Sequence, residues 1–273
     1  MFLFMHPHAA LKGGRGKTGD FPRVVLAPGD MEESYTETKR AFYLAEKYQL
    51  PVIIITDKHL AESFKSVNLA EEEKKFVWDY SLRLNVTENV SENQRNKEGL
   101  YLRYAAGNLQ RTLPGNPQGI YTCAGDEHNE VGEITEDPLI RKQMMERRMK
   151  KLELVRKELP TLEVLGSKNA EMTVVGWGSP QGATLEAISK LNQEGKKINC
   201  LWIKYLLPFP QEVQKILSEA KKIVLVENNY SGQLGELIAE KTGILIKDKI
   251  LRYDGYTFSV NELYGELQKK WSK

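Results

Sequence analysis

A group of polar side chains follows the apolar segment 223–226, which has the length and composition of a buried strand. The residues of this group are Glu227, Asn228, Asn229 and Gln233. Open α/β sheets bind ligands at the carboxyl ends of their strands, so these side chains could form a polar contact surface facing another domain or subunit. The alternative is a turn, in which Asn228 and Asn229 tolerate left-handed geometry and Ser231 caps the next helix. Both interpretations stay open.

A second group, Asp126, Glu127 and His128, has the residue types of a metal site. Its acids are adjacent in sequence rather than one helical turn apart, so few of them could converge on one ion. No metal site is predicted, and we expect His128 to be a hydrogen-bonded structural residue. Like the first group, this one is expected to position the chain or to contact a subunit, not to make or break bonds.

A third group, Pro28, Gly29 and Asp30, ends the apolar segment Val24–Ala27, which is typical of a buried strand. The group lies at the strand edge where ligands bind, and we predict a weak cofactor contact there. Asp30 also has a structural use. It can cap a helix that begins at residue 31, with Glu33 completing a capping box.

Residues 13–18 resemble a Walker A loop, which would hold a phosphate. However, Leu11 occupies the position of its first glycine, and no buried strand precedes it. No P-loop is predicted.

Gly176 and Gly178 follow a predicted strand, as in a dinucleotide-binding turn. Gln181 stands where the third glycine belongs, and no acidic residue ends the next strand. We expect the two glycines to allow a tight turn, with Ser179 capping the next helix. A dinucleotide-binding Rossmann protein remains an alternative.

These groups need elements to position them, and apolar segments alternate with helical patterns along the chain. The predicted strands are Val24–Ala27, Val52–Ile55, Met172–Val175, Ile198–Ile203, Ile223–Val226 and Ile244–Ile246. The predicted helices begin at Met31, at Asp137-Pro138 and near Ser179-Pro180, Pro210 and Ser231. This alternation predicts an α/β fold whose second half is a doubly wound parallel sheet. Basic residues between 141 and 151 alternate with glutamates and are interpreted as a solvated helix face.

The composition is that of an ordinary globular chain. Its 273 residues carry a formal net charge of +2, which demands no nucleic-acid partner. The apolar segment 1–5 is too short for a membrane span and lacks the charged start of a signal peptide. Cys123 and Cys200 are the only cysteines, too few for a cubane cluster or an all-thiolate zinc site. We expect a cytoplasmic protein that binds neither nucleic acid nor membrane.

Several short motifs, in their order along the chain, resemble the alpha subunits of 2-oxoacid:ferredoxin oxidoreductases. They are residues 19–30 (GDFPRVVLAPGD), 48–53 (YQLPVI), 125–137 (GDEHNEVGEITED), 176–179 (GWGS) and 227–234 (ENNYSGQL). The resemblance runs from about residue 19 to the C-terminus. It implies an α/β fold, with the later part of a pyrimidine-type thiamine-diphosphate-binding domain at 19–135 and a transketolase C-terminal-like domain at 161–273. We expect a linker helix at 136–160 and a disordered arm at 1–18.

The resemblance also implies an activity. In such enzymes a 2-oxoacid is decarboxylated on thiamine diphosphate with Mg, coenzyme A takes the acyl group, and electrons reach ferredoxin. A beta subunit is expected to supply the diphosphate-binding domain and the iron–sulfur cluster. The two cysteines of this chain agree with a cluster in the partner.

The family's YPITP motif, its GGPSTG loop and its activating glutamate precede the segment that matches 19–30, and none is found in residues 1–18. Proton exchange at the aminopyrimidine depends on that glutamate. We therefore expect the isolated chain to hold no cofactor and to be inactive without partner chains. A non-catalytic relic or assembly module of the same fold is the alternative. A shortened first domain should expose apolar surface, which predicts self-association or a tight partner.

Overall fold

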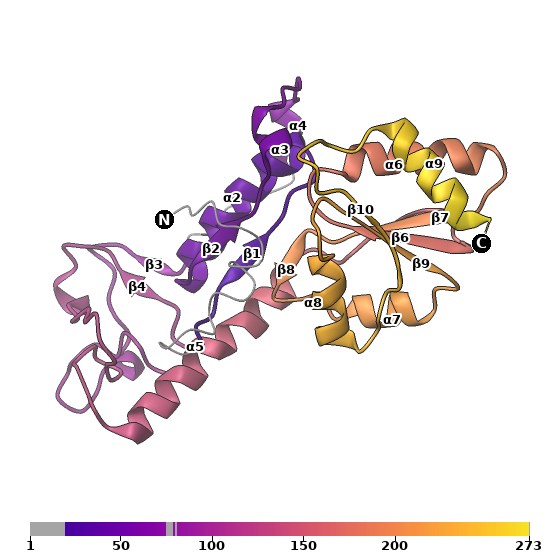
Figure 1. The fold of residues 1–273 in the computed structure, drawn as a ribbon. Coiled ribbons are helices and arrows are strands. Elements are labelled where there is room, and N and C mark those ends of the chain that lie inside the picture. The colour runs from indigo at the N-terminus through magenta and orange to yellow at the C-terminus, as the bar shows by residue number, and fades with distance from the viewer. Residues whose placement is uncertain (1–19, 75–78, 80, 273) are drawn as a thin grey trace.

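The computed structural model describes residues 20–74, 79 and 81–272. The predicted arm 1–18, with its Walker-like segment 13–18, lies outside these residues. Figure 1 shows two lobes. We call residues 20–160 the first lobe and residues 161–272 the second lobe.

The second lobe is built on a five-stranded sheet with the order β10-β9-β6-β7-β5. Its strands are β5 (Val164–Gly166), β6 (Met172–Gly176), β7 (Ile198–Trp202), β9 (Ile223–Glu227) and β10 (Asp248–Leu251). The helices are α6 (Gln181–Gln193), α7 (Glu212–Ser218), α8 (Gln233–Thr242) and α9 (Val260–Trp271). Helices α6 and α9 pack on one face and α7 and α8 on the other. All strand pairs are parallel except the edge pair β5–β7, so the predicted doubly wound sheet is confirmed.

One predicted strand, Ile244–Ile246, is wrong. Gly243 ends α8 in left-handed geometry (φ 76°), and the apolar run after it packs irregularly, with Ile246 in the core. The strand forms later, as β10, where Asp248 pairs with Val224 of β9. Strand β10 lies at the sheet edge, and Ile250 is its one buried residue, so it has no apolar run in the sequence. The search for an apolar run therefore placed the strand too early, at 244–246.

The first lobe begins with a parallel β-α-β unit: β1 (Val24–Leu26), α2 (Met31–Tyr48) and β2 (Val52–Ile54). Asp30 caps α2 as predicted, since its carboxylate accepts from the Glu33 amide at 2.7 Å. The predicted capping box is not formed in its usual way. Glu33 accepts from the amide of Gly29, one residue before the cap, at 2.8 Å.

The rest of the first lobe is mostly loop and ends in a long helix. Its elements are α3 (Lys58–Glu62), α4 (Leu69–Lys74), β3 (Arg83–Leu84), β4 (Arg111–Thr112), the 3-10 turns η1 (Glu92–Gln94) and η2 (Pro117–Gly119), and α5 (Pro138–Glu158). Helix α5 starts where predicted, with Asp137 accepting from the amides of Leu139 and Ile140. The interpretation of its basic run as a solvated face is wrong for Lys151, which is 7% exposed.

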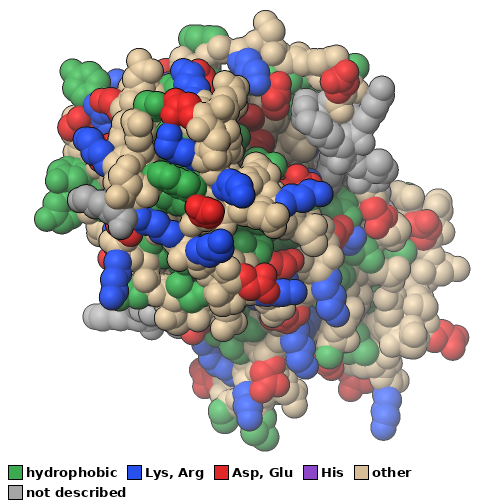
Figure 2. Space-filling model, turned by 90° about the vertical axis from the view of Figure 1, so that its right-hand side faces the viewer, with side chains coloured by type: hydrophobic (Ala, Val, Ile, Leu, Met, Phe, Trp, Pro, Cys, Tyr) green, Lys and Arg blue, Asp and Glu red, His purple; other side chains and the backbone are tan. Residues whose placement is uncertain are grey.

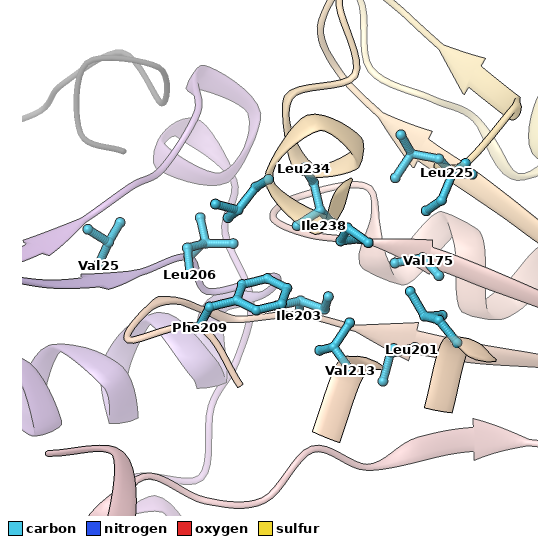
Figure 3. Close-up of a cluster of buried hydrophobic side chains, with 14 of the residues drawn as sticks. Val25, Val175, Leu201, Ile203, Leu206, Phe209, Val213, Leu225, Leu234 and Ile238 are labelled. Carbon is cyan, nitrogen blue, oxygen red and sulfur yellow. The ribbon is translucent and has the colours of Figure 1, made fainter. Parts of the chain in front are cut away.

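The two lobes share a strand and a core. Strand β8 (Tyr205–Leu207) follows β7 in the second lobe, yet it pairs antiparallel with β1 in a sheet of order β2-β1-β8. Figure 3 shows one buried cluster that contains side chains from both lobes. Val25 of β1 belongs to it together with Leu206 and Phe209. Buried clusters and the β1–β8 pair therefore extend across the predicted division near residue 160, and the domain limits themselves stay a prediction.

Basic and acidic side chains are interspersed over the face of the second lobe in Figure 2. Within the described ranges, no helix combines the length and the apolar character that a membrane span requires.

Candidate functional site

The parallel strands of both lobes direct their carboxyl ends toward one region between the lobes. The amide of Ala27, just after β1, donates to the carbonyl of Lys204, just after β7, at 2.8 Å. Polar side chains from both lobes meet around this contact. We call this set the interlobe junction: Glu33, Asp57, Ser179, Gln181, Lys204 and Asn228. It occupies the edge at which α/β proteins bind ligands.

Glu33 connects the lobes at the junction. Its Oε1 accepts from Nζ of Lys204 at 2.7 Å and from Nε2 of Gln181 at 3.4 Å, while its Oε2 accepts from the Gly29 amide. The side chains of the Glu33–Lys204 pair are 19% and 28% exposed, so water screens the pair only partly. One carboxylate thus joins the start of α2 to the ends of β1 and β7.

Asp57 makes the second connection. It caps α3 by accepting from the Leu60 amide at 2.9 Å, and its other oxygen accepts from the hydroxyl of Ser179. Asn228 donates to the same hydroxyl at 3.5 Å. The prediction that Ser179 caps α6 is therefore wrong: no side chain caps that helix, and the hydroxyl bonds to the other lobe.

Of the predicted group Pro28, Gly29 and Asp30, Gly29 lies closest against Gln181 of the second lobe. A Cβ placed there would lie 2.0 Å from Oε1 and 2.9 Å from Cβ of Gln181, so a larger residue would force Gln181 to shift. Asp30 is engaged in capping α2. Pro28 is buried beside them. The predicted cofactor contact of this group stays a prediction.

Glu227 is fully buried at the end of β9 and has a structural task. It accepts from the amides of Leu234 and Gly235, both at 3.1 Å, from the Trp177 indole at 2.9 Å and from Asn229 at 2.6 Å. Three of these bonds end on Oε2 and one, from Gly235, ends on Oε1, so most of the acceptor capacity of the carboxylate is used inside the second lobe.

Asn229 completes the helix start, since its oxygen accepts from the amides of Gly232 and Gln233 at 2.7 and 3.2 Å. The turn interpretation was wrong in its details. Gly232, not Ser231, is the N-cap residue of α8, and Asn228 and Asn229 are not among the residues with positive φ.

Asn228 differs from its neighbours because it faces a cleft. The cleft has a volume of about 300 Å³ and lies between α3 and the start of α6. Gly29, Asp30 and Ser179 also line it. The side-chain oxygens of Asn228, Gln181 and Gln233 are buried without a hydrogen-bond partner. Buried acceptors of this kind are normally matched, so the oxygens of Asn228 and Gln181 mark the junction as a place where a donor could bind.

The third predicted group lies elsewhere, next to the first turns of α5 (Figure 1). Arg148 donates two hydrogen bonds of 2.8 Å to Glu127, and Arg141 donates one of 2.6 Å. The hydrogen bonds from Arg148 lower the pKa of the Glu127 carboxyl below its usual value, although partial burial opposes them.

His128 accompanies this ion pair. Its Nδ1 lies 3.0 Å from the carbonyl of Asp126, and its ring lies 4.4 Å from that of Tyr104. No group of His, Cys, Asp or Glu suited to a metal ion occurs within the described part of the chain. The loop is therefore docked on α5, while its proposed subunit contact remains a prediction.

Contacts with Trp202 explain why glycine is suited to position 176 and involve the backbone of Gly178. A Cβ on Gly176 would lie 2.3 Å from the ring of Trp202, whose indole donates to the Gly178 carbonyl at 3.1 Å. These contacts favour the tight-turn interpretation over dinucleotide binding.

Sequence reasoning missed the junction residues Glu33, Asp57, Gln181 and Lys204 as members of a site. Each follows a predicted strand or opens a predicted helix, so the carboxyl-end rule could have singled them out. Their partners could not be named, because Glu33 and Lys204 lie 171 residues apart.

Two family models match this chain, one mainly over each lobe. Residues 8–146 match the family described as pyruvate flavodoxin/ferredoxin oxidoreductase, thiamine diphosphate-binding. The chain belongs to this oxidoreductase family. Residues 170–263 match pyruvate:ferredoxin oxidoreductase core domain II, which covers most of the second lobe of this family member.

Named relatives agree with this membership. The alpha subunit of a 2-oxoacid:ferredoxin oxidoreductase from Saccharolobus solfataricus is 35% identical over 251 residues, 90% of this chain. That of oxidoreductase 1 from Aeropyrum pernix is 32% identical over 252 residues, also 90%. The chain spans 38% of the length of each relative.

Among solved structures, a 2-oxoglutarate:ferredoxin oxidoreductase from Magnetococcus marinus, with 2-oxoglutarate, coenzyme A and succinyl-CoA bound, superposes with a TM-score of 0.80 at 26% identity. The match covers 97% of this chain and 44% of that chain. The resemblance seen in the motifs and the predicted fold class are thus confirmed.

The described residues do not by themselves fit a complete thiamine diphosphate site. Of the junction carboxylates, Glu33 and Asp57 are already hydrogen-bonded across the lobes. The unmatched groups at the junction are the side-chain oxygens of Asn228 and Gln181. These oxygens and the oxygens of a diphosphate are all hydrogen-bond acceptors, so they cannot bind one another.

Proposed function

We propose that the chain acts as a subunit of a thiamine-diphosphate-dependent 2-oxoacid:ferredoxin oxidoreductase. The enzyme would decarboxylate a 2-oxoacid oxidatively to an acyl-CoA and reduce ferredoxin. In this assembly the chain provides a scaffold and an interface, and it needs partner chains for activity.

One observation carries the proposal: both family segments occur in order, and their lobes are joined with the carboxyl ends of their parallel strands together. Such edges bind ligands, and the buried side-chain oxygens of Asn228 and Gln181 accept no hydrogen bond there. The similar Magnetococcus marinus enzyme has an oxoacid and coenzyme A compounds bound.

The proposal assigns the cofactors to the assembly. Thiamine diphosphate and Mg would be completed by the beta subunit, which would also hold the iron–sulfur cluster. Coenzyme A and ferredoxin would bind to the assembled enzyme. Asp126, Glu127 and His128, docked on α5, Asn228 of the junction, and Gln233 at the start of α8 are the proposed positioning and interface residues.

Co-expression with a cluster-bearing beta subunit tests the proposal. We expect a stable complex that reduces ferredoxin when a 2-oxoacid, coenzyme A, thiamine diphosphate and Mg are supplied. The chain alone, under the same conditions, should be inactive. If the complex forms and no oxoacid supports ferredoxin reduction, the catalytic assignment fails.

An assembly module of the same fold is the second candidate. It is favoured by the structural engagement of the carboxylates Glu33, Asp57 and Glu227, which are all hydrogen-bonded within the chain. A module would bind the beta subunit without raising its turnover. Decarboxylation of an oxoacid by the isolated chain would exclude this candidate.

A further inference from the structure

A large groove lies in the first lobe, away from the interlobe junction. It has a volume of about 960 Å³ and runs between α5 and the segments 96–109 and 129–133. The apolar side chains in its walls include Leu102, Leu109, Val131, Met144 and Leu154. The volume is within the range of small-molecule sites.

Lys151 of α5 lines this groove although its side chain is 7% exposed. Its Nζ donates to the carbonyl of Gln49 at 3.2 Å. An ammonium group has three donors, so this bond leaves donors available. Arg147, one turn earlier and also in the lining, donates to the carbonyls of Ala105 and Asn108, both at 3.1 Å.

Arg103 adds a third positive charge behind the lining. It is 4% exposed, and it donates to the side chain of Gln49, the residue whose carbonyl receives Lys151. Its Nε and Nη1 have no hydrogen-bond partner. Its guanidinium lies over the rings of Tyr104 and Tyr121, at 5.2 and 5.3 Å from their centroids.

No described carboxylate forms an ion pair with these three cations; Glu130 acts on Arg147 only from beyond ion-pair distance. Buried charges are normally paired, because desolvation costs several kcal/mol per ion. Burial, followed by the neighbouring arginines, lowers the pKa of Lys151 to about 8. Burial likewise lowers the pKa of Arg147 to about 10. We call the part of the groove formed by Lys151 and Arg147, with Arg103 behind them, the groove floor. It has an excess of positive charge.

The groove's acids lie at exposed positions: Glu98, Glu130, Glu133, Glu146 and Glu153. Water and salt screen exposed charges strongly, whereas the buried cations keep their field. Several negative charges of an acidic polypeptide would be repelled by these glutamates. A compact molecule has only one negative charge, and that charge can lie next to Lys151 and Arg147.

We propose that this groove binds a small organic monoanion, a carboxylate on an apolar body. The carboxylate binds Lys151 and Arg147, and the apolar part lies against Leu102, Leu109 and Met144. The carboxylate supplies the negative charge that the floor lacks. The site is separate from the interlobe junction and does not depend on the catalytic assignment.

Calorimetric titration of the full chain with 2-naphthoate tests the proposal, with 2-naphthalenemethanol as the neutral probe of the same shape. We expect naphthoate to bind at least tenfold more tightly than the alcohol. Lys151→Met should weaken naphthoate binding by about tenfold or more, the effect of losing about 1.4 kcal/mol, and should leave the alcohol within about twofold. Lys142→Met, at an exposed position of α5 outside the groove lining, should change neither.

Three results would overturn the proposal. In the first, Lys151→Met binds naphthoate as the wild type does while remaining folded by circular dichroism. In the second, inorganic phosphate displaces naphthoate at equal concentration, which would assign the floor to a small inorganic anion. In the third, a beta subunit competes with naphthoate, which would make the groove a subunit contact. Should Lys151→Met fail to fold, Arg147→Met gives the same test.

Discussion

The carboxylate of Glu33, in the first turn of α2, accepts a hydrogen bond of 2.7 Å from the ammonium of Lys204, which follows β7. This pair fixes the start of one lobe against the strand ends of the other. In a double-mutant cycle with Glu33→Gln and Lys204→Met, we expect a coupling free energy of about 1 kcal/mol from urea unfolding. Glu33→Gln keeps an acceptor for the Gly29 amide, and its effect on the Gln181 contact is present with and without Lys204, so that effect cancels from the coupling.

The control for this cycle is the pair of Glu186 and Lys190 on α6. It has a similar distance, 3.0 Å, but its side chains are 58% and 45% exposed. Its coupling should be below about 0.5 kcal/mol. Equal couplings for the two pairs would show that the junction pair contributes no more than a surface contact.

The contact between Gly29 and Gln181 predicts a rescue. Gly29→Ala places a Cβ 2.0 Å from Oε1 of Gln181, so we expect a loss of about 2 kcal/mol in the free energy of unfolding. Gln181→Gly in the same chain removes the clash and should restore most of the loss. Gly182→Ala, where a Cβ meets nothing within 4 Å, is the matched control and should be neutral or stabilising.

Glu227→Gln tests the buried cap of α8. The amide keeps one acceptor and places an NH₂ group among four donors, so we expect a loss of about 3 kcal/mol in urea unfolding. Glu219→Gln, at an exposed position after α7, should stay within about 0.5 kcal/mol of wild type. A neutral Glu227→Gln would mean that the helix start is held by Asn229.

Much of the fold could be predicted because local signals set the elements. Asp30 and Asp137 cap α2 and α5 as expected, since the caps act within a few residues. Strand β8 was missed because three residues show no period, and its partner is β1, far away in sequence. The edge strand β5 was missed because all its residues are exposed.

The sequence predicted where the candidate site lies, but it did not predict what each of its residues does. Glu227 and Asn229 lie at the strand end where sequence reasoning put them, yet they cap α8. Ser179 satisfies the local pattern of a helix cap, but a carboxylate 122 residues away takes its hydroxyl. Contacts between distant segments decide such roles, and a local pattern does not contain them.

The two cysteines should differ in reactivity. Cys200 of β7 is fully buried, and burial raises the pKa of its thiol to about 12, whereas Cys123 is exposed. The thiolate is the reactive form. A thiol-specific disulfide reagent at pH 8 should therefore modify one cysteine in the native chain and both in guanidinium chloride. Cys123→Ser should leave no fast-reacting thiol, and rapid native labelling of that variant would contradict the burial of Cys200.

Lys151 predicts an unusual pH dependence of stability. Its pKa falls from 10.5 to about 8 on folding, so between these values the unfolded chain binds more protons than the folded chain. The free energy of unfolding therefore rises with pH between about 8 and 10.5. Below about pH 8 the buried, charged Lys151 destabilises the folded chain by its full amount. The charged groups that act on it are Arg103, Arg147 and Arg148, all cations.

Lys151→Met removes this dependence. We expect the variant to be more stable than wild type below pH 8, and the difference to shrink by about 3 kcal/mol as pH approaches 10.5. Urea unfolding at several pH values measures it, with Lys142→Met as the control for an exposed lysine. Saturating naphthoate should flatten the wild-type slope, because a bound anion returns the ammonium to its charged form. A difference that does not vary with pH would mean that Lys151 titrates normally, and the groove floor would then lack its unbalanced charge.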